Sequence, residues 1–278
     1  MIPKSLLGIL EDVRVSFAPV PQALAEARSC GVLWQTAPGR FLLDLPGVAR
    51  YLVEFGKSVT IDTVPEVETE TVERFFRMTP LAALLCQRGV LPLHAACAAN
   101  GSGSVILAGD SGVGKTTLLT ALVARGWKIL ADDLTALDVG PSGNVTVCPV
   151  FPEVALWPDA LRIMTGCIES LPRACGNRHV LSLSDHFCSD PQPVTSIFHL
   201  CAHSGAGIDV AQLFGSSAFQ AIGMISYNSH IADSLFDRSC FMRCAAALSN
   251  STPLYRLRRP RGQWSVDELA DLVSRGIT

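Results

Sequence analysis

A glycine-rich segment at residues 109–117 constrains this chain more than any other feature, because it fills every fixed position of the phosphate-binding pattern G-x-x-x-x-G-K-[ST]. The apolar run at 104–108 predicts a buried strand before it, and the leucine-rich run at 117–125 predicts a helix after it. A chance glycine-rich turn would lack this context. The sequence therefore predicts a strand–loop–helix unit that binds phosphate through Gly109, Asp110, Ser111, Gly112, Val113, Gly114, Lys115, Thr116 and Thr117.

The backbone and the side chains of this loop have different predicted roles. Gly109, Gly112 and Gly114 allow N–H groups to turn toward an anion at the N-terminus of a helix. Lys115 is expected to reach the terminal phosphates, and the Thr116 hydroxyl to bind Mg²⁺. The loop by itself thus predicts a nucleotide bound together with Mg²⁺.

An acidic pair, Asp132 and Asp133, ends the next predicted strand at 127–131. Carboxylates at the carboxyl end of a strand, next to a phosphate-binding loop, are in the position to bind a metal ion or to contact an attacking hydroxyl. Only one helix and one strand separate the pair from Lys115, which argues against motor and transporter ATPases. The Asn-Lys-x-Asp motif of switch GTPases does not occur in the sequence. The alternative is that the two aspartates have no role in binding and simply begin a solvated loop.

His94 lies upstream, in an apolar run at 90–96 that predicts a strand next to the strand of the phosphate loop. A single histidine in such a run is usually a satisfied core residue. Close to the loop and the acidic pair, it is also a titratable group that can orient a carboxylate or stabilise transferring charge. The residues alone leave both interpretations open.

Together these elements resemble the HPr kinase/phosphorylase family, in which a Leu-His-Gly/Ala segment, a G-D-S-G-V-G-K-S/T loop and an Ala-Asp-Asp triplet follow one another. The chain has the same order at 93–95, 109–116 and 131–133. The resemblance implies an α/β fold with a P-loop kinase core related to phosphoenolpyruvate carboxykinase. It also implies ATP and Mg²⁺ as cofactors, and a peptide or protein substrate with an acceptor serine.

The resemblance assigns roles to individual residues. Asp132 would be the base for the acceptor hydroxyl and His94 its charge partner. Lys115 and Thr116 would hold phosphate and metal, and Asp133 would be a magnesium ligand or a supporting carboxylate. A basic residue from a later loop completes the phosphate site in such kinases, and Arg178, in the basic segment 173–179, is the candidate. A solvated surface loop is the alternative there.

The chain departs from the bacterial regulator after the acidic pair. The Glu-Ile-Arg-Gly-Leu-Gly segment of that enzyme is missing, which argues against efficient phosphorolysis. A proline-rich stretch at 149–161 stands in its place and is similar to divergent members found beside lasso-peptide biosynthesis enzymes, which phosphorylate a precursor peptide. Glu153 or Asp159 is a candidate for the missing metal-binding glutamate, with a surface acid as the alternative.

Composition excludes several classes of function. The 278 residues carry a net charge of −3, so no electrostatic footprint for nucleic acid is expected. No run of eighteen apolar residues and no secretory signal is found, so the sequence predicts a cytoplasmic protein without membrane contact. The ten cysteines lack Cys-x-x-Cys spacing, which favours free thiols over disulfides. A zinc site at His199, Cys201 and His203 is a weak alternative.

The predicted organisation is an N-terminal β-rich region plus helix at 1–88, followed by the kinase domain at 89–278. Turn signals punctuate short apolar runs from 31 to 64, and a helical pattern interrupted near Pro80 covers 69–88. The resemblance also makes a homo-oligomer plausible. Two other functions compete with the serine kinase: a non-catalytic nucleotide-binding regulatory protein and a small-molecule kinase.

Overall fold

The computed structural model describes residues 10–140, 142–165, 178–227, 235 and 238–276. It is a mixed α/β structure that divides into two compact units, Met1–Pro92 with Ser226–Cys244, and Leu93–Ile225 with Ala245–Thr278. No local signal in the sequence indicates that 226–244 belongs with the first unit. Most of the basic segment 173–179 lies outside the described residues, and only Arg178 and His179 can be placed.

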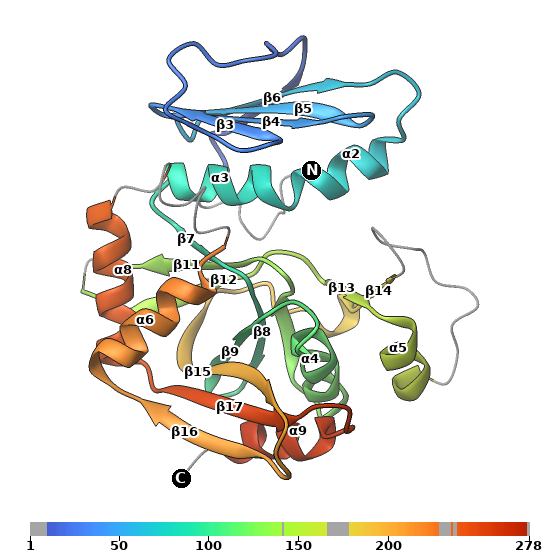
Figure 1. Ribbon diagram of the computed structural model, residues 1–278, viewed down its shortest axis with the longest axis vertical. Helices are drawn as coiled ribbons and strands as arrows, with labels where there is room; N and C mark the ends of the chain where they lie inside the picture. The colour runs from blue at the N-terminus through green and yellow to red at the C-terminus, as the bar shows by residue number, and fades with distance from the viewer. Residues whose placement is uncertain (1–9, 141, 166–177, 228–234, 236–237, 277–278) are drawn as a thin grey trace. The chain divides into compact units, whose positions relative to one another are not determined.

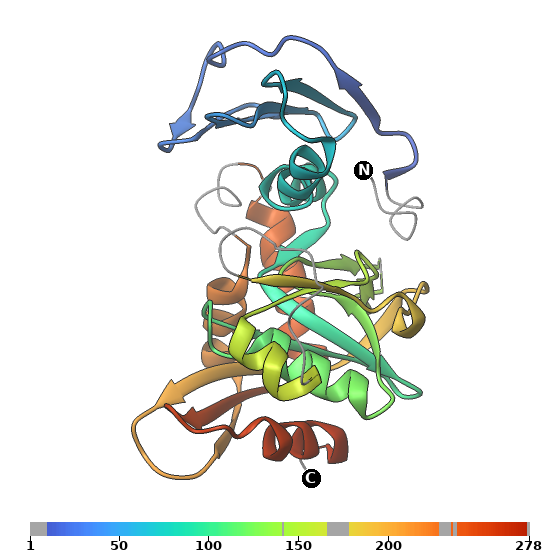
Figure 2. The same cartoon turned by 90° about the vertical axis from the view of Figure 1, so that its right-hand side faces the viewer.

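The first unit is built on a six-stranded sheet (Figures 1 and 2). Four successive strands pair antiparallel as the turn signals predicted, and β1 pairs parallel with β6. Helix α3 (Thr79–Gln87) packs on β4 and β5. The strand order is β1 (Arg14–Phe17), β6 (Ser58–Thr63), β5 (Ala49–Glu54), β4 (Arg40–Leu45), β3 (Trp34–Ala37) and β2 (Ser29–Cys30).

The helical pattern at 69–88 forms two helices, α2 (Thr69–Phe76) and α3, with the break at Arg77 and Met78. Pro80 lies in the first turn of α3. Proline is tolerated there because its missing N–H has no partner within the helix. The predicted interruption is therefore confirmed.

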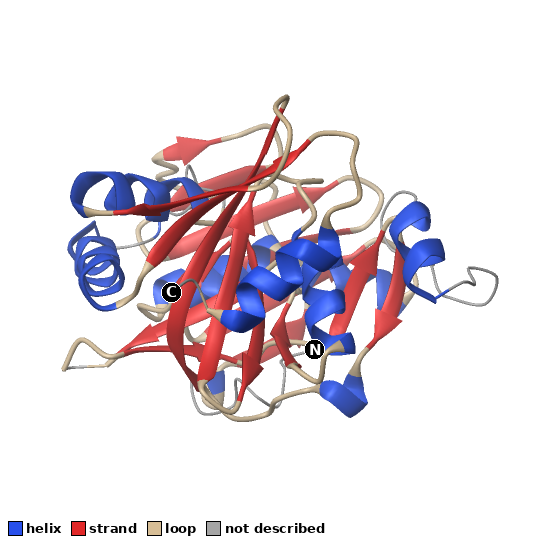
Figure 3. Cartoon of the chain, turned by 90° about the horizontal axis from the view of Figure 1, so that it is seen from below, coloured by secondary structure: helices blue, strands red, loops and turns tan. Residues whose placement is uncertain are grey.

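The second unit contains a large mixed sheet, whose strands lie side by side in Figure 3. Strand β9 lies between antiparallel β8 and parallel β15, and β17 pairs parallel with the other edge of β15. Along this path of hydrogen-bonded neighbours, the strands follow one another as β10 (Lys128–Ala131), β8 (Ala95–Asn100), β9 (Gly103–Gly109), β15 (Gln192–His203), β12 (Val145–Cys148) and β11 (Thr135–Val139). Off this path, β16 (Asp209–Leu213) pairs with β17 (Leu254–Pro260), and β13 (Glu153–Leu156) pairs with β14 (His179–Ser182). The short β7 (Leu91–Leu93) crosses the boundary between the units.

Helix α4 (Lys115–Ala124) packs on β8, β9 and β10, and α9 (Val266–Arg275) packs against α4. The α4–α9 contact belongs to one buried apolar cluster, which includes Leu118 and Leu122 of α4, Leu269 of α9, Phe198 of β15 and Leu257 of β17. Each such side chain contributes about 1.5–3 kcal/mol by leaving water. This core includes Leu107, just before the glycine-rich loop, and Leu118, just after it. The other helices are α5 (Pro158–Thr165), α6 (Gly215–Ile225), α8 (Arg238–Ser251) and the 3-10 turn η2 (Ser184–His186).

Two expectations from composition can be compared with the described residues. No helix among them combines the length and apolar character needed to cross a bilayer. The cysteines among them are all free thiols, and Cys86, Cys97, Cys148 and Cys244 are buried.

Candidate functional site

The predicted strand–loop–helix unit is present, with the loop between β9 and α4. Helix α4 begins at Lys115, two residues before the expected start, and Gly114 with φ of 108° is its N-cap. Gly109 has φ of 136°, and a Cβ there would collide with the carbonyl oxygen of Leu200 on β15. Only glycine adopts this conformation without strain. The loop therefore needs glycine where the chain leaves the sheet.

We expect Gly109→Ala to lower the free energy of unfolding by about 1–3 kcal/mol, because it adds backbone strain and a collision with Leu200. Chemical denaturation measures the effect. Gly101→Ala is the matched control, since no heavy atom lies within 4 Å of a Cβ at that position. Equal stability of Gly109→Ala and the wild type would show that the loop can relax around the added methyl group.

The Lys115 ammonium is almost buried, with the residue 5% exposed, and it joins the loop to His94. Nζ donates to the carbonyl oxygens of Gly109 at 2.8 Å and Asp110 at 3.2 Å, and lies 3.1 Å from Nε2 of His94. Burial lowers the pKa of Lys115, and the charges of Asp133 and Asp132 oppose that shift. The ammonium is thus hydrogen-bonded to loop carbonyls, next to the place where a phosphate-binding loop holds its anion.

Asp132 lies directly beside the threonine of the loop. Its Oδ1 accepts a hydrogen bond from Oγ1 of Thr116 at 3.0 Å. Burial and the neighbouring charge of Asp133 raise the pKa of Asp132 to about 7, while the bond from Thr116 acts in the opposite direction. This carboxyl group can therefore gain or lose a proton near neutral pH.

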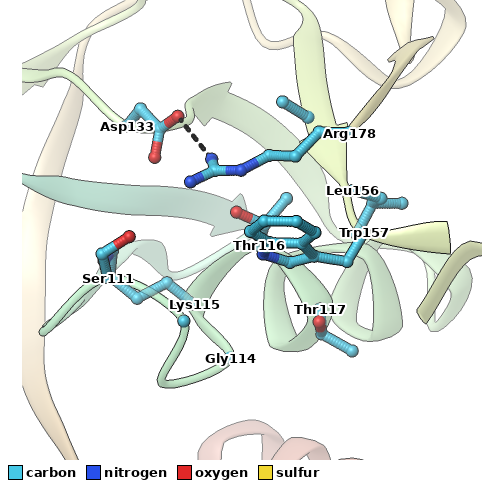
Figure 4. A pocket seen from close by; sticks show the side chains of 11 residues that line it. Ser111, Gly114, Lys115, Thr116, Thr117, Asp133, Leu156, Trp157 and Arg178 are labelled. Carbon is cyan, nitrogen blue, oxygen red and sulfur yellow. Dashed lines mark hydrogen bonds and ion pairs between the residues drawn. The ribbon is translucent and has the colours of Figure 1, made fainter. Parts of the chain in front are cut away.

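Asp133 has a strained backbone and faces the later loop. The N–H of Leu134 donates to the Asp132 carbonyl at 2.7 Å, which makes Asp133 the centre of a γ-turn, and its φ is 61°. Such a turn with positive φ is rare and costly for a residue other than glycine. Oδ2 of Asp133 pairs with Nη1 of Arg178 at 3.5 Å, and the Arg178 guanidinium lies 5.3 Å from the centre of the Trp157 ring (Figure 4).

His94 belongs to the site. It lies between β7 and β8, and its backbone N–H donates to the backbone carbonyl of Ile225 at 2.8 Å. Burial first, and then the charge of Lys115, lower the pKa of His94, while Asp133 opposes the shift through its charge and its backbone. The imidazole is therefore neutral at pH 7 and can accept a hydrogen bond from the Lys115 ammonium. The ring links the loop to the acidic pair.

A pocket with a volume of about 60 Å³ opens between the loop and β13. Arg178 and Trp157 both line this pocket, and the guanidinium lies over the Trp157 ring. The lining residues are Ser111, Gly112, Gly114, Lys115, Thr116, Thr117, Asp133, Ala155, Leu156, Trp157 and Arg178. Figure 4 shows these side chains around Trp157.

Glu153 and Asp159 are not among the residues that line the pocket. Glu153 begins β13, two residues before the lining residue Ala155, and Asp159 lies in the first turn of α5. Strand residues two apart lie about 6.6 Å from each other. In the described part of the chain, no group of three or more His, Cys, Asp or Glu side chains is placed to hold a metal ion. The metal role of Glu153 stays a prediction.

Sequence reasoning did not assign two residues of this neighbourhood, Trp157 and Arg259. Nε of Arg259 on β17 donates to the carbonyl of Val113 in the loop at 2.8 Å. Its neighbour Arg258 points to the opposite face of the strand and binds Asp209 through Nε at 2.7 Å. Successive strand residues face opposite sides of a sheet, so these two arginines must lie on different faces. The buried residues Leu254, Leu257 and Pro260 recur at every third position and gave no signal for which arginine meets the loop.

Comparison with known proteins adds little to this geometry. No protein-family model and no curated protein sequence matches the chain. Among solved structures, it is similar to the HPr(Ser) kinase/phosphatase from Coxiella burnetii, with 13% sequence identity and a TM-score of 0.36. The match covers 66% of this chain and 94% of the other. A similarity this low carries no inference about function, which must come from the residues of the site.

Proposed function

We propose that this chain is an ATP-dependent serine kinase with an HPr-kinase-like P-loop core, acting on a peptide or protein. The main observation in support of this proposal is that the Lys115 ammonium contacts both the loop carbonyls and His94. This contact supports the proposal because a cation, the glycine-rich loop and an imidazole lie within hydrogen-bond distance of one another, and Thr116 at the end of the loop bonds to Asp132. A buried cation and a titrating carboxyl group are the parts that phosphoryl transfer needs.

The loop residues fit a nucleotide with Mg²⁺. Backbone N–H groups at the start of α4 and the Lys115 ammonium suit phosphate oxygens. The Thr116 hydroxyl is an oxygen donor of the kind that Mg²⁺ prefers, and its hydrogen bond to Asp132 at 3.0 Å orients it. The ion would neutralise charge on the phosphates. Asp133 would support the site by holding Arg178, whose guanidinium suits a phosphoryl group.

Asp132 is the proposed base. Its pKa of about 7 leaves a large fraction ionised at neutral pH, and the residue is only half-buried. In the proposed reaction the serine O–H bond breaks as its proton passes to Asp132. The serine oxygen forms a bond to the γ-phosphorus, and the bond from that phosphorus to the bridging oxygen breaks to release ADP.

The test is transfer of radiolabel from the γ-phosphate of ATP. Serine-containing precursor peptides of the lasso-peptide type are the proposed acceptors, each paired with its Ser→Ala version. Label on the serine peptide but not on its alanine version supports the proposal. Label on a metabolite supports a small-molecule kinase, and nucleotide binding without any transfer supports a regulatory protein.

His94→Ala is expected to lower the rate of transfer about tenfold to a hundredfold, because Lys115 loses its partner at Nε2 and the acidic pair loses its link to the loop. Steady-state kinetics with the labelled peptide measure the change. His203→Ala is the matched control, since that imidazole bonds to Gly207 away from the pocket. A stable His94→Ala protein with full activity would return His94 to a purely structural role.

A further inference from the structure

We infer that Arg259 is a positioning residue that holds the phosphate loop in its anion-accepting conformation. This inference rests on the proposed function, because it concerns how the same loop binds a nucleotide. It adds a residue from β17, 146 positions away in the chain, that no sequence motif of the loop contains.

The strand register brings Arg259 to the loop. Leu200 on β15 lies opposite Gly109, the last residue of β9, and Ala202 on β15 lies opposite Arg259. Parallel β17 therefore ends at the same edge of the sheet as β9. At this edge Nε of Arg259 donates to the Val113 carbonyl at 2.8 Å, and Nη1 donates to the Pro260 carbonyl at 3.3 Å. Two hydrogen bonds thus orient the half-buried guanidinium.

The bond to Val113 determines where the next N–H points. In a trans peptide group the C=O and the N–H project in opposite directions. The carbonyl of Val113 and the N–H of Gly114 belong to one such group, so a carbonyl held toward Arg259 turns that N–H away from it. Gly114 lines the pocket and has φ of 108°, a conformation with many nearby alternatives for glycine. Arg259 restricts these alternatives.

Arg259 also brings a permanent positive charge next to the loop. Its Nε would lie 3.7 Å from a Cβ on Gly114. A guanidinium keeps its proton throughout the physiological pH range. Both effects favour the nucleotide phosphates and neither acts on the acceptor hydroxyl. Loss of Arg259 should therefore weaken nucleotide binding and leave the chemical step nearly unchanged.

The experiment measures dissociation constants of ATP and ADP by calorimetry, together with KM for ATP and kcat. We expect Arg259→Ala to bind both nucleotides about tenfold to a hundredfold more weakly, with KM raised and kcat changed less than about threefold. Arg259→Lys should recover most of the affinity, because its ammonium can still donate to Val113. Arg258→Ala, on the opposite face and paired with Asp209, is the matched control and should bind as the wild type does.

Each outcome separates this inference from the proposed function. If the wild type binds ATP and Arg259→Ala binds it equally well, Arg259 has no positioning role and the kinase proposal stands. Equal weakening by Arg258→Ala would likewise overturn the inference, since general loss of charge would explain it. If Arg259→Ala fails to fold, Arg259→Lys decides: affinity close to wild type supports the inference, and a lower kcat at unchanged KM overturns it. A wild type that binds no nucleotide overturns both proposals.

Discussion

Lys115→Ala is expected to abolish detectable phosphoryl transfer and to weaken ATP binding about a hundredfold or more, because it removes the cation inside the glycine loop. The fold should persist, since the side chain contacts two loop carbonyls and one imidazole rather than the apolar core. Circular dichroism and the melting temperature monitor the fold. Labelled-phosphate transfer and calorimetry measure the two functional effects.

The control for this variant is Lys128→Ala. Lys128 begins β10 and is exposed, so its loss changes the net charge equally without touching the loop. It should transfer phosphate at the wild-type rate. Turnover of ATP by Lys115→Ala at the wild-type rate would contradict the assignment of residues 109–117 as a phosphate-binding loop.

Asp132→Asn is expected to lower kcat by about a hundredfold or more while nucleotide affinity changes little, because an amide cannot accept the serine proton. The pH dependence gives a second readout. Since the pKa of Asp132 is raised to about 7, the wild-type kcat/KM should rise with pH up to about 7 and then level off. The active form is the ionised one, so activity is lost as the pH falls. The residual activity of Asp132→Asn should lack this rise.

Two further variants separate this role from general charge effects. Asp138→Asn, on an exposed position of β11, should behave as the wild type does. Asp133→Asn should weaken the hold on Arg178 and keep a pH dependence, with its midpoint moved below 7 because the charge of Asp133 no longer raises the pKa of Asp132. If Asp133→Asn loses the pH dependence and Asp132→Asn retains it, the base is Asp133 and the assignment to Asp132 is wrong.

Part of the site was predictable because it is local. The pattern at 109–117, with the apolar runs around it, indicated the strand, the loop and the helix, and β9 and α4 confirm both elements. The acidic pair follows the loop after one helix and one strand. A single strand–helix–strand crossover was therefore enough to predict that the pair lies at the same edge of the sheet as the loop. His94 was expected near the loop because its apolar run comes shortly before the strand of the loop, and the antiparallel pairing of Ala95 with Ala108 confirms that the two strands are neighbours.

The partners within the site were not predictable in the same way. The resemblance left Asp133 as either a magnesium ligand or a supporting carboxylate, and it did not indicate that Thr116 bonds to Asp132 or that Asp133 pairs with Arg178. Which of two adjacent acids faces inward depends on a γ-turn at Asp133. Aspartate is one of the few residues other than glycine that is enriched at positive φ, but Asp132 and Asp133 share this tendency, so the sequence does not indicate which of them adopts the turn.

The sequence by itself therefore determined the residues that lie within one βαβ crossover, which are the glycine-rich loop with its lysine and threonine and the two acids that follow. Only the tertiary structure decided the environment of these groups. The raised pKa of Asp132 comes from burial together with the charge of Asp133, and the bond from Arg259 to Val113 comes from parallel pairing of β17 with β15. Local patterns define elements and their faces, whereas pairing between distant strands depends on the summed burial of the whole core.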